Sequence, residues 1–241
     1  MWRDKSVFAV VPARGGSKGV ARKNLVQLAG KSLIAHAASF VANLPWLDVA
    51  IISTDEPEMR DEAARFGLRS PFLRPADLAG DAAEAIDVWR HAWLATEADQ
   101  NRQFDLGIYL EPTSPLRSAN DVERCLDAVT EGGYETAATV TQTPPSHSYQ
   151  KSLAIDGEGR LEFCAPASER LNRRQLVPPT WHRNGLCYAA QRLAIIEGDD
   201  IIADRCAGVV VERRTVNIDE AFDFRIAEVI LQDEAKTAGV S

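Results

Sequence analysis

The chain has 241 residues and a formal net charge of −8, because 35 acidic side chains outnumber 27 basic ones. This acidic balance argues against non-specific binding to nucleic acid or to an anionic membrane surface. None of the four cysteines forms a Cys-x-x-Cys pair, which argues against a zinc site or a dithiol redox motif. The first apolar run is too short to span a membrane and lacks the shape of a signal peptide, so we expect a cytoplasmic protein.

Short apolar runs alternate with helical patterns through the first half of the chain. Strands are predicted at 7–11, 49–53 and 106–110, and helices at 33–41, 57–67, 84–99 and 119–131. This order predicts an α/β fold, in which helices cover both faces of a mainly parallel sheet.

The alternation breaks near residue 142. Residues 142–182 are rich in proline and polar side chains and contain only short strand-like pieces, such as 153–155, so we interpret them as an inserted arm. A strand at 208–212 and a C-terminal helix follow. We assign the packed face of that helix to its apolar residues, which are Phe222, Ile226, Val229 and Ile230. One domain is therefore predicted over 1–241, with the arm at about 142–182.

A basic, glycine-rich segment, "VPARGGSKGVARKN" (11–24), comes directly after the first predicted strand. Ligands of open α/β sheets lie beyond the carboxyl ends of the strands, and glycines let backbone N–H groups approach phosphate closely. Arginine and lysine add charge, so the segment predicts a cradle for a nucleoside triphosphate. The alternative is a simple turn with a solvated charged face. A Walker loop is excluded because Leu25 stands where that motif needs glycine, and no G-x-G-x-x-G occurs.

Six stretches in order resemble the CMP-acylneuraminate (sialic acid) synthetases and their cytidylyltransferase relatives, which include enzymes for pseudaminic and legionaminic acids. The stretches are 11–37, 51–55, 73–81, 109–117, 183–188 and 217–224. The resemblance implies a single three-layer, Rossmann-like nucleotidyltransferase domain whose inserted arm serves in dimerisation. It also implies a reaction in which the anomeric hydroxyl of an acid sugar attacks the α-phosphorus of CTP and pyrophosphate leaves, assisted by Mg²⁺.

The same resemblance implies roles for particular residues. Those expected to be catalytic are Arg14, Lys23 and Asp219. Those expected to contact the nucleotide are Ala13, Arg14, Gly15, Ser17, Lys18, Lys23, Asn24, Arg74 and Pro75. Those expected to contact the acid sugar are Glu111, Lys151, Arg174, Asn184 and Tyr188, with the two arm residues contributed by the other subunit of a homodimer. Those expected at the metal are Asp219, Asn217 and Glu111.

Two positions depart from the pattern of the sialic acid synthetases. Glu111 stands where they usually carry glutamine, and Asn217 where they usually carry aspartate. These changes weaken the case for N-acetylneuraminate itself but leave the triphosphate loop complete. We predict that the two changes compensate at the metal; the alternative is that they are unrelated and Glu111 is solvated or paired to Arg117.

Three readings of function stay open at this point. The first is a cytidylyltransferase for a sialic-acid-like nonulosonic acid, and the second is the same chemistry on another keto-acid sugar or a phosphonate. The third is a nucleotide-binding protein without turnover.

In the stretch 109–117, Thr113 and Ser114 are expected to cap the next helix, and Arg117 to be structural.

Overall fold

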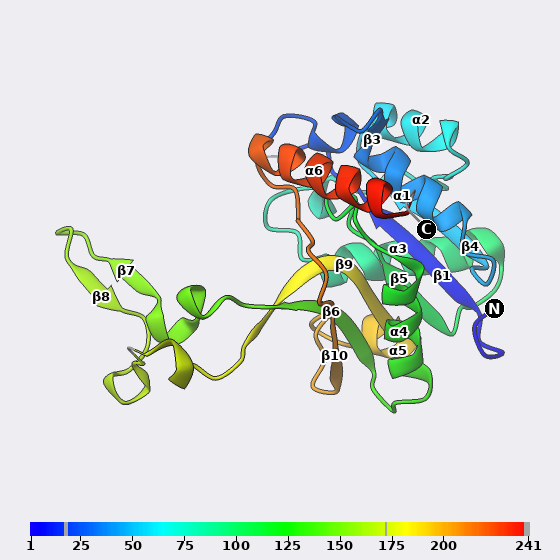
Figure 1. The fold of residues 1–241 in the computed structure, drawn as a ribbon. Coiled ribbons are helices and arrows are strands. Elements are labelled where there is room, and N and C mark those ends of the chain that lie inside the picture. The colour runs from blue at the N-terminus through cyan, green and yellow to red at the C-terminus, as the bar shows by residue number, and fades with distance from the viewer. Residues whose placement is uncertain (17–18, 172, 239–241) are drawn as a thin grey trace.

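A six-stranded sheet forms the centre of the computed structural model, which describes residues 1–16, 19–171 and 173–238 (Figure 1). In spatial order the strands are β10 (Cys206–Val210), β6 (Thr136–Gln142), β9 (Trp181–Gln191), β5 (Leu106–Tyr109), β1 (Val7–Pro12) and β4 (Val49–Ser53). Strand β1 pairs in parallel with β4 and β5, and β10 pairs in parallel with β6. Strand β9 runs antiparallel to both β5 and β6. The predicted α/β class is therefore confirmed, with a mixed but mostly parallel sheet.

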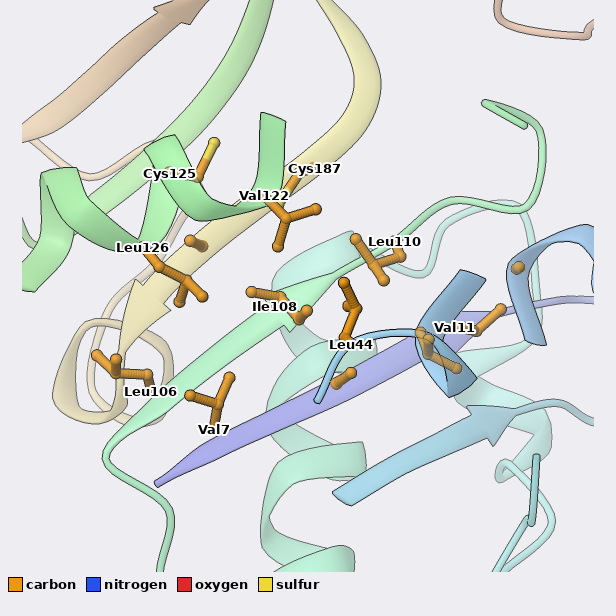
Figure 2. Packing of buried hydrophobic residues seen from close by; sticks show 14 of the residues in the cluster. Val7, Val11, Leu44, Leu106, Ile108, Leu110, Val122, Cys125, Leu126 and Cys187 are labelled. Carbon is orange, nitrogen blue, oxygen red and sulfur yellow. The ribbon is translucent and has the colours of Figure 1, made fainter. Parts of the chain in front are cut away.

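Helices cover both faces of the sheet. On one face pack α1 (Leu33–Ala42), α2 (Pro57–Arg65) and α4 (Ala119–Thr130), and on the other α3 (Ala85–Gln100) and α5 (Arg192–Ile196). Strand β1 shows the division, because Val7, Ala9 and Val11 join the first layer, which Figure 2 shows, while Phe8 and Val10 join the second. The predicted three-layer arrangement follows from this alternation.

Helix α4 begins at a capping box rather than at the predicted hydroxyls. The Oγ of Ser118 accepts a hydrogen bond from the Asp121 N–H at 3.3 Å, and the Asp121 carboxylate accepts from the Ser118 N–H at 2.8 Å. The expectation that Thr113 and Ser114 cap this helix was wrong, because the helix starts only at Ala119. The Ser114 hydroxyl instead donates to the Asn184 carbonyl at 3.0 Å.

An arm leaves the body between β6 and β9 and projects far to one side (Figure 1). It holds an antiparallel hairpin of β7 (Leu153–Ile155), a strand that the sequence predicted, and β8 (Leu161–Phe163). Short 3₁₀ turns accompany it at Pro145–His147, Tyr149–Lys151, Ala167–Glu169 and Arg174–Leu176. The root of the arm continues the sheet, since residues 140–142 of β6 still pair with residues 181–183 of β9.

The C-terminal helix α6 (Ala221–Ala238) is present, but the face predicted to pack is wrong. Phe224 and Ala227 are the buried residues, and they pack in a small cluster with Leu28 of the hairpin β2 (Gln27–Leu28) and β3 (Lys31–Ser32). Phe222 and Val229 are instead exposed by 60% and 57%. The helix carries two apolar stripes, and periodicity alone does not say which one meets the body.

The four cysteines are free thiols, of which Cys125 and Cys187 are buried, Cys206 is half-buried and Cys164 is exposed. Within the described ranges, no helix is both long and apolar enough to cross a membrane.

Candidate nucleotide-binding cleft

A cleft of about 540 Å³ opens where β1 and β5 end. These strands are parallel neighbours, so the loops that follow them emerge at the same edge of the sheet. Six of the residues predicted for the site line the cleft together: Arg14, Lys23, Asn24, Arg74, Glu111 and Asp219.

The loop after β1 packs closely against two other segments at its glycines. A Cβ added at Gly15 would lie 2.4 Å from the side chain of Glu56, and one at Gly19 would lie 2.2 Å from the Asp219 carbonyl oxygen. The Gly15 N–H also donates to the Asp55 carboxylate at 3.1 Å. Glycine at these two positions therefore lets the loop lie against the segments that begin α2 and α6.

Two cations of the cleft are each held by a carboxylate from a distant segment. Arg14 Nη1 lies 2.8 Å from Asp81 Oδ1, and Lys23 Nζ lies 3.0 Å from Asp219 Oδ1. The Lys23 side chain is only 12% exposed, so its ammonium is held against Asp219 rather than freely solvated. The sequence reasoning missed Asp81, although this residue ends the quoted stretch 73–81. Ser17 and Lys18 lie outside the described residues.

Two buried polar side chains form the deeper wall. The Nδ2 of Asn24 donates to the Arg14 carbonyl at 3.3 Å, while its buried Oδ1 has no hydrogen-bond partner among the residues that the structure describes. Arg74 is 6% exposed, and its guanidinium donates to Oγ of Ser53 at 3.1 Å and to the Ser53 carbonyl. Burial lowers the pKa of Arg74. Buried polar groups that line a cleft are suited to hydrogen-bonding a ligand.

Ala13 and Pro75, the predicted neighbours of Arg14 and Arg74, shape the backbone around the cleft rather than its lining. Ala13 is buried, and its N–H donates to the Ser53 carbonyl at 2.9 Å, which continues the pairing of β1 with β4. Pro75 is exposed and precedes the 3₁₀ turn Ala76–Leu78. Neither residue is among those that line the cleft.

Glu111 lies at the end of β5, and its carboxylate is wedged against β9. A Cβ added at Gly185 would lie 2.4 Å from Glu111 Oε2 and 2.6 Å from Ser114 Oγ. Gly185 also has φ +70°, a left-handed conformation that other residues adopt at a cost. Glycine at 185 thus makes room for the Glu111 carboxylate, a role that only the three-dimensional structure reveals.

The electrostatic surroundings of Glu111 are mixed. Burial raises the pKa of Glu111 to about 7, and Asp219 adds to this effect, while Arg117, Arg183 and Lys23 oppose it. Arg117 itself directs its guanidinium to backbone carbonyls, namely that of Leu186 at 2.9 Å and that of Glu111. Arg117 therefore braces the loop, as expected of a structural residue, and no ion pair joins its guanidinium to the Glu111 carboxylate.

The remaining predicted residues do not line this cleft. The Asn184 amide donates to Thr141 Oγ1 at 3.0 Å and accepts from the Leu186 N–H at 3.2 Å, so it holds the irregular part of β9. Tyr188 is buried and packs edge-on against Tyr109, at 6.2 Å between ring centroids. Burial raises the pKa of both phenols.

Of the three predicted residues that remain, one precedes α6 and two belong to the arm. Asn217 is exposed and is not among the lining residues. Lys151 and Arg174 belong to the projecting arm, and the side chain of Arg174 lies outside the described part of the chain.

The cleft offers oxygen donors that suit a magnesium ion bound together with phosphates. Asp219 and Glu111 both line it, and Asp219 is close enough to raise the pKa of Glu111. Among the described residues, no group of three or more His, Cys, Asp and Glu is arranged to hold a metal by itself. Mg²⁺ commonly takes only one or two carboxylates and completes its shell with substrate phosphates and water, so this donor set fits it.

A cleft beside a glycine-rich loop, lined by both basic and acidic side chains at the carboxyl edge of a three-layer α/β sheet, is typical of a nucleotide-binding protein. Residues 8–155 match the family model described as Cytidylyltransferase, and the chain belongs to this family of enzymes.

Relatives and a solved structure cover almost the whole chain. The pseudaminic acid cytidylyltransferase of Campylobacter jejuni is 26% identical over 234 residues, which are 96% of this chain and 98% of the relative. The CMP-N,N'-diacetyllegionaminic acid synthase of Legionella pneumophila is 27% identical over 231 residues, 94% of this chain and 96% of the relative. The structure of CMP:2-keto-3-deoxy-manno-octonic acid synthetase with CTP superposes with a TM-score of 0.69 at 16% identity, covering 95% of this chain and 99% of that one. That likeness confirms the fold.

Proposed function

We propose that this chain transfers CMP from CTP to the anomeric hydroxyl of an acid sugar of the nonulosonic class and releases pyrophosphate. The observation that carries the proposal is that Arg14 and Lys23, both from the loop after β1, meet Asp219, from the distant segment before α6, in one cleft. The names of the relatives, which act on pseudaminic and legionaminic acids, support the class of acceptor.

The triphosphate is assigned to the cationic side of the cleft. Arg14 and Lys23 are held at their carboxylate partners before a substrate contacts them, so little reorganisation is needed when they bind phosphate oxygens. The hydroxyl oxygen forms a bond to the α-phosphorus while the bond from that phosphorus to the bridging oxygen breaks. Negative charge grows on the departing pyrophosphate, and the two cations stabilise it. The hydroxyl proton is released to solvent or to a carboxylate of the cleft.

The nucleoside is assigned to the deeper wall, where Asn24 and Arg74 lie. The buried Oδ1 of Asn24 can accept from a hydroxyl or amino group, and Arg74 can donate from its remaining N–H groups. A ligand that satisfies the Asn24 oxygen removes the cost of burying it unpaired.

The acid sugar is assigned to the space beside Glu111, with Tyr188 and Asn184 shaping the wall behind it. Its carboxylate needs a cation, and we assign this role to Lys151 of the partner subunit and Arg174 of the partner subunit, in a homodimer. The arm supports this assignment because it projects away from the body of its own chain (Figure 1).

Asp219 and Glu111 are the residues proposed to hold Mg²⁺, with Asn217, two residues before Asp219, as a further oxygen donor. When bound, the ion neutralises triphosphate charge and favours deprotonation of the attacking hydroxyl.

The test is pyrophosphate release from CTP with a panel of acceptors: N-acetylneuraminate, pseudaminic acid, a legionaminic acid, 2-keto-3-deoxy-manno-octonate and a phosphonate. We expect release with a nonulosonic acid other than N-acetylneuraminate, together with formation of the matching CMP ester. Release only with the octonate or the phosphonate would assign the same chemistry to another acceptor. CTP binding without release from any acceptor would overturn the proposal in favour of a binding protein.

A further inference from the structure

Strand β9 runs from the arm into the sheet with an irregular register (Figure 1). Tyr188 pairs with Ala138 of β6, and Arg183 pairs with Val140. A step of two residues along β6 is therefore matched by a step of five along β9, which carries three extra residues at this point. Ala138 and Val140 are two apart in β6 and so point to the same face of the sheet. The extra residues thus bring Arg183 to the face that holds Tyr188.

The nucleotide-binding cleft opens on this same face. Tyr188, Ala138 and Tyr109 pack in one cluster with α3, and the cleft is lined by Tyr109 and, from α3, by Val88. Strand β5 ends at Tyr109, which pairs with Tyr188, so the earlier residues of the antiparallel strand β9 lie beyond the carboxyl end of β5. Arg183 therefore lies on the face of the sheet, and beyond the edge of it, where the cleft is found.

Arg183 is also close to the carboxylate of Glu111. A Cβ added at Gly185 would lie 2.4 Å from Glu111 Oε2, and the two residues from Gly185 back to Arg183 span at most about 7 Å. Burial raises the pKa of Glu111, and Arg183 opposes this rise more strongly than Lys23 does, although Lys23 lines the cleft. The charge of Arg183 thus acts on the space beside Glu111, to which the acid sugar is assigned.

The guanidinium of Arg183 is not committed to another group. Lys23 is bound by Asp219, and Arg117 is bound by backbone carbonyls. The side chain of Arg183 is exposed and makes no hydrogen bond or ion pair with any residue that the structure describes. It can therefore bind an incoming anion without first breaking a contact. Arginine suits a carboxylate in particular, because it offers two parallel N–H donors to the two oxygens.

We infer that Arg183 is a specificity-determining residue of the acid-sugar subsite, whose guanidinium binds the sugar carboxylate from the same chain that holds the nucleotide. The inference rests on the proposed function and deepens it, because that function assigns the carboxylate only to cations of a partner subunit. Glu111 makes such a cation necessary. It can add a negative charge where the sialic acid synthetases usually carry glutamine, and like charges in one subsite repel each other. Arg183 offsets this repulsion and favours acceptors that carry a carboxylate.

The test is isothermal titration calorimetry of the full-length chain without turnover. The chain is first saturated with Mg²⁺ and a CTP analogue in which a methylene group replaces the α,β-bridging oxygen, so that no CMP is transferred. Pseudaminic acid and a legionaminic acid are then titrated, each beside its own methyl ester, which keeps the sugar but lacks the negative charge. Wild type should bind at least one acid more tightly than its ester. Arg183→Ala should lower this preference about 10- to 100-fold by weakening the acid alone, with the Kd of the CTP analogue unchanged.

Two further variants separate this role from a structural one. Arg183→Lys keeps the charge without the paired donors, so it should restore part of the preference for the acid. Arg60→Ala is the matched control, because Arg60 is an exposed arginine of α2 that does not line the cleft, and its loss changes the net charge by the same amount. It should leave the preference unchanged. If Arg183→Ala fails to fold, Arg183→Gln, which keeps a polar side chain, takes its place.

Three outcomes would overturn the inference. They are an unchanged preference in Arg183→Ala, an equal weakening of acid and ester, and a wild-type chain that binds neither acid more tightly than its ester. Pyrophosphate release in the acceptor panel decides the proposed function separately. Release by wild type together with an unchanged preference in Arg183→Ala would leave that function intact and refute only the role of Arg183.

Discussion

Replacing Glu111 by glutamine tests whether the cleft disfavours a negative charge at this position. Burial raises the pKa of Glu111 from an ordinary 4.5 to about 7, so the folded chain keeps the proton over a range in which the unfolded chain loses it. The unfolded state binds fewer protons between these two values, and the free energy of unfolding therefore falls as pH rises from 4.5 to 7. Glutamine is nearly isosteric with glutamate and has no charge. In the Glu111→Gln variant the free energy of unfolding therefore does not fall for this reason.

The size of the effect follows from the two pKa values. The raised pKa lowers the free energy of unfolding by about 3 kcal/mol at pH 8. At pH 5 the same effect is under about 1 kcal/mol. Glu111→Gln should therefore gain about 2–3 kcal/mol relative to wild type between pH 5 and pH 8.

The assay is urea denaturation at pH 5, 6, 7 and 8, with EDTA and without nucleotide, so that no bound cation stabilises the carboxylate. Glu228→Gln, on an exposed position of α6, controls for the loss of one negative charge. If the difference between Glu111→Gln and wild type is the same at all four pH values, the reasoning about burial is refuted.

Three further predictions concern the cleft. Lys23→Ala should lower kcat by about 100- to 1,000-fold in steady-state kinetics, because one preorganised charge contact to the triphosphate is lost; near-normal kinetics would contradict this role. Gly185→Ala should lower the free energy of unfolding by about 2–3 kcal/mol through its left-handed φ and its contact with Glu111, while Gly80→Ala, where a Cβ meets nothing within 4 Å, should not. Glu111→Gln should raise the Mg²⁺ concentration needed for half-maximal activity, and adding Asn217→Asp should restore it, because residues that share one ion are coupled; strictly additive effects would show that the two positions are independent.

The strands of the first half of the chain were predictable because each is a short apolar run between breaks, and the helices because their apolar residues recur at helical spacing or their ends carry proline or glycine. Strand β9 was not, since three polar residues follow its first residue, Trp181, it includes Gly185, and it acquires its pairing only when β5 and β6 lie on either side of it. Strand β6 is built largely from alanine and threonine, which give a weak apolar signal. In these strands tertiary pairing outweighs local pattern.

The same division applies to the site. The loop after β1 was recognisable from composition, while Arg74, Glu111 and Asp219 were assigned from the resemblance to cytidylyltransferases, and all of these residues meet in one cleft. The partnership of Arg14 with Asp81 and the space that Gly185 leaves for Glu111 depend on segments far apart in sequence. On α6, the sequence showed the apolar stripe with Phe222 and Val229 but not that it faces outward, because nothing local separates a stripe packed on the body from one that is exposed.

The central claim is that CMP moves from CTP to the hydroxyl of an acid sugar. Phosphorus-31 NMR of one reaction, with CTP, Mg²⁺ and the best acceptor of the panel, tests it directly. The account predicts that the three CTP resonances disappear together while one phosphodiester resonance and pyrophosphate appear in equal molar amounts, and that Lys23→Ala slows all of these changes. Persistence of CTP with every acceptor, or formation of free CMP and pyrophosphate without a phosphodiester, would contradict it.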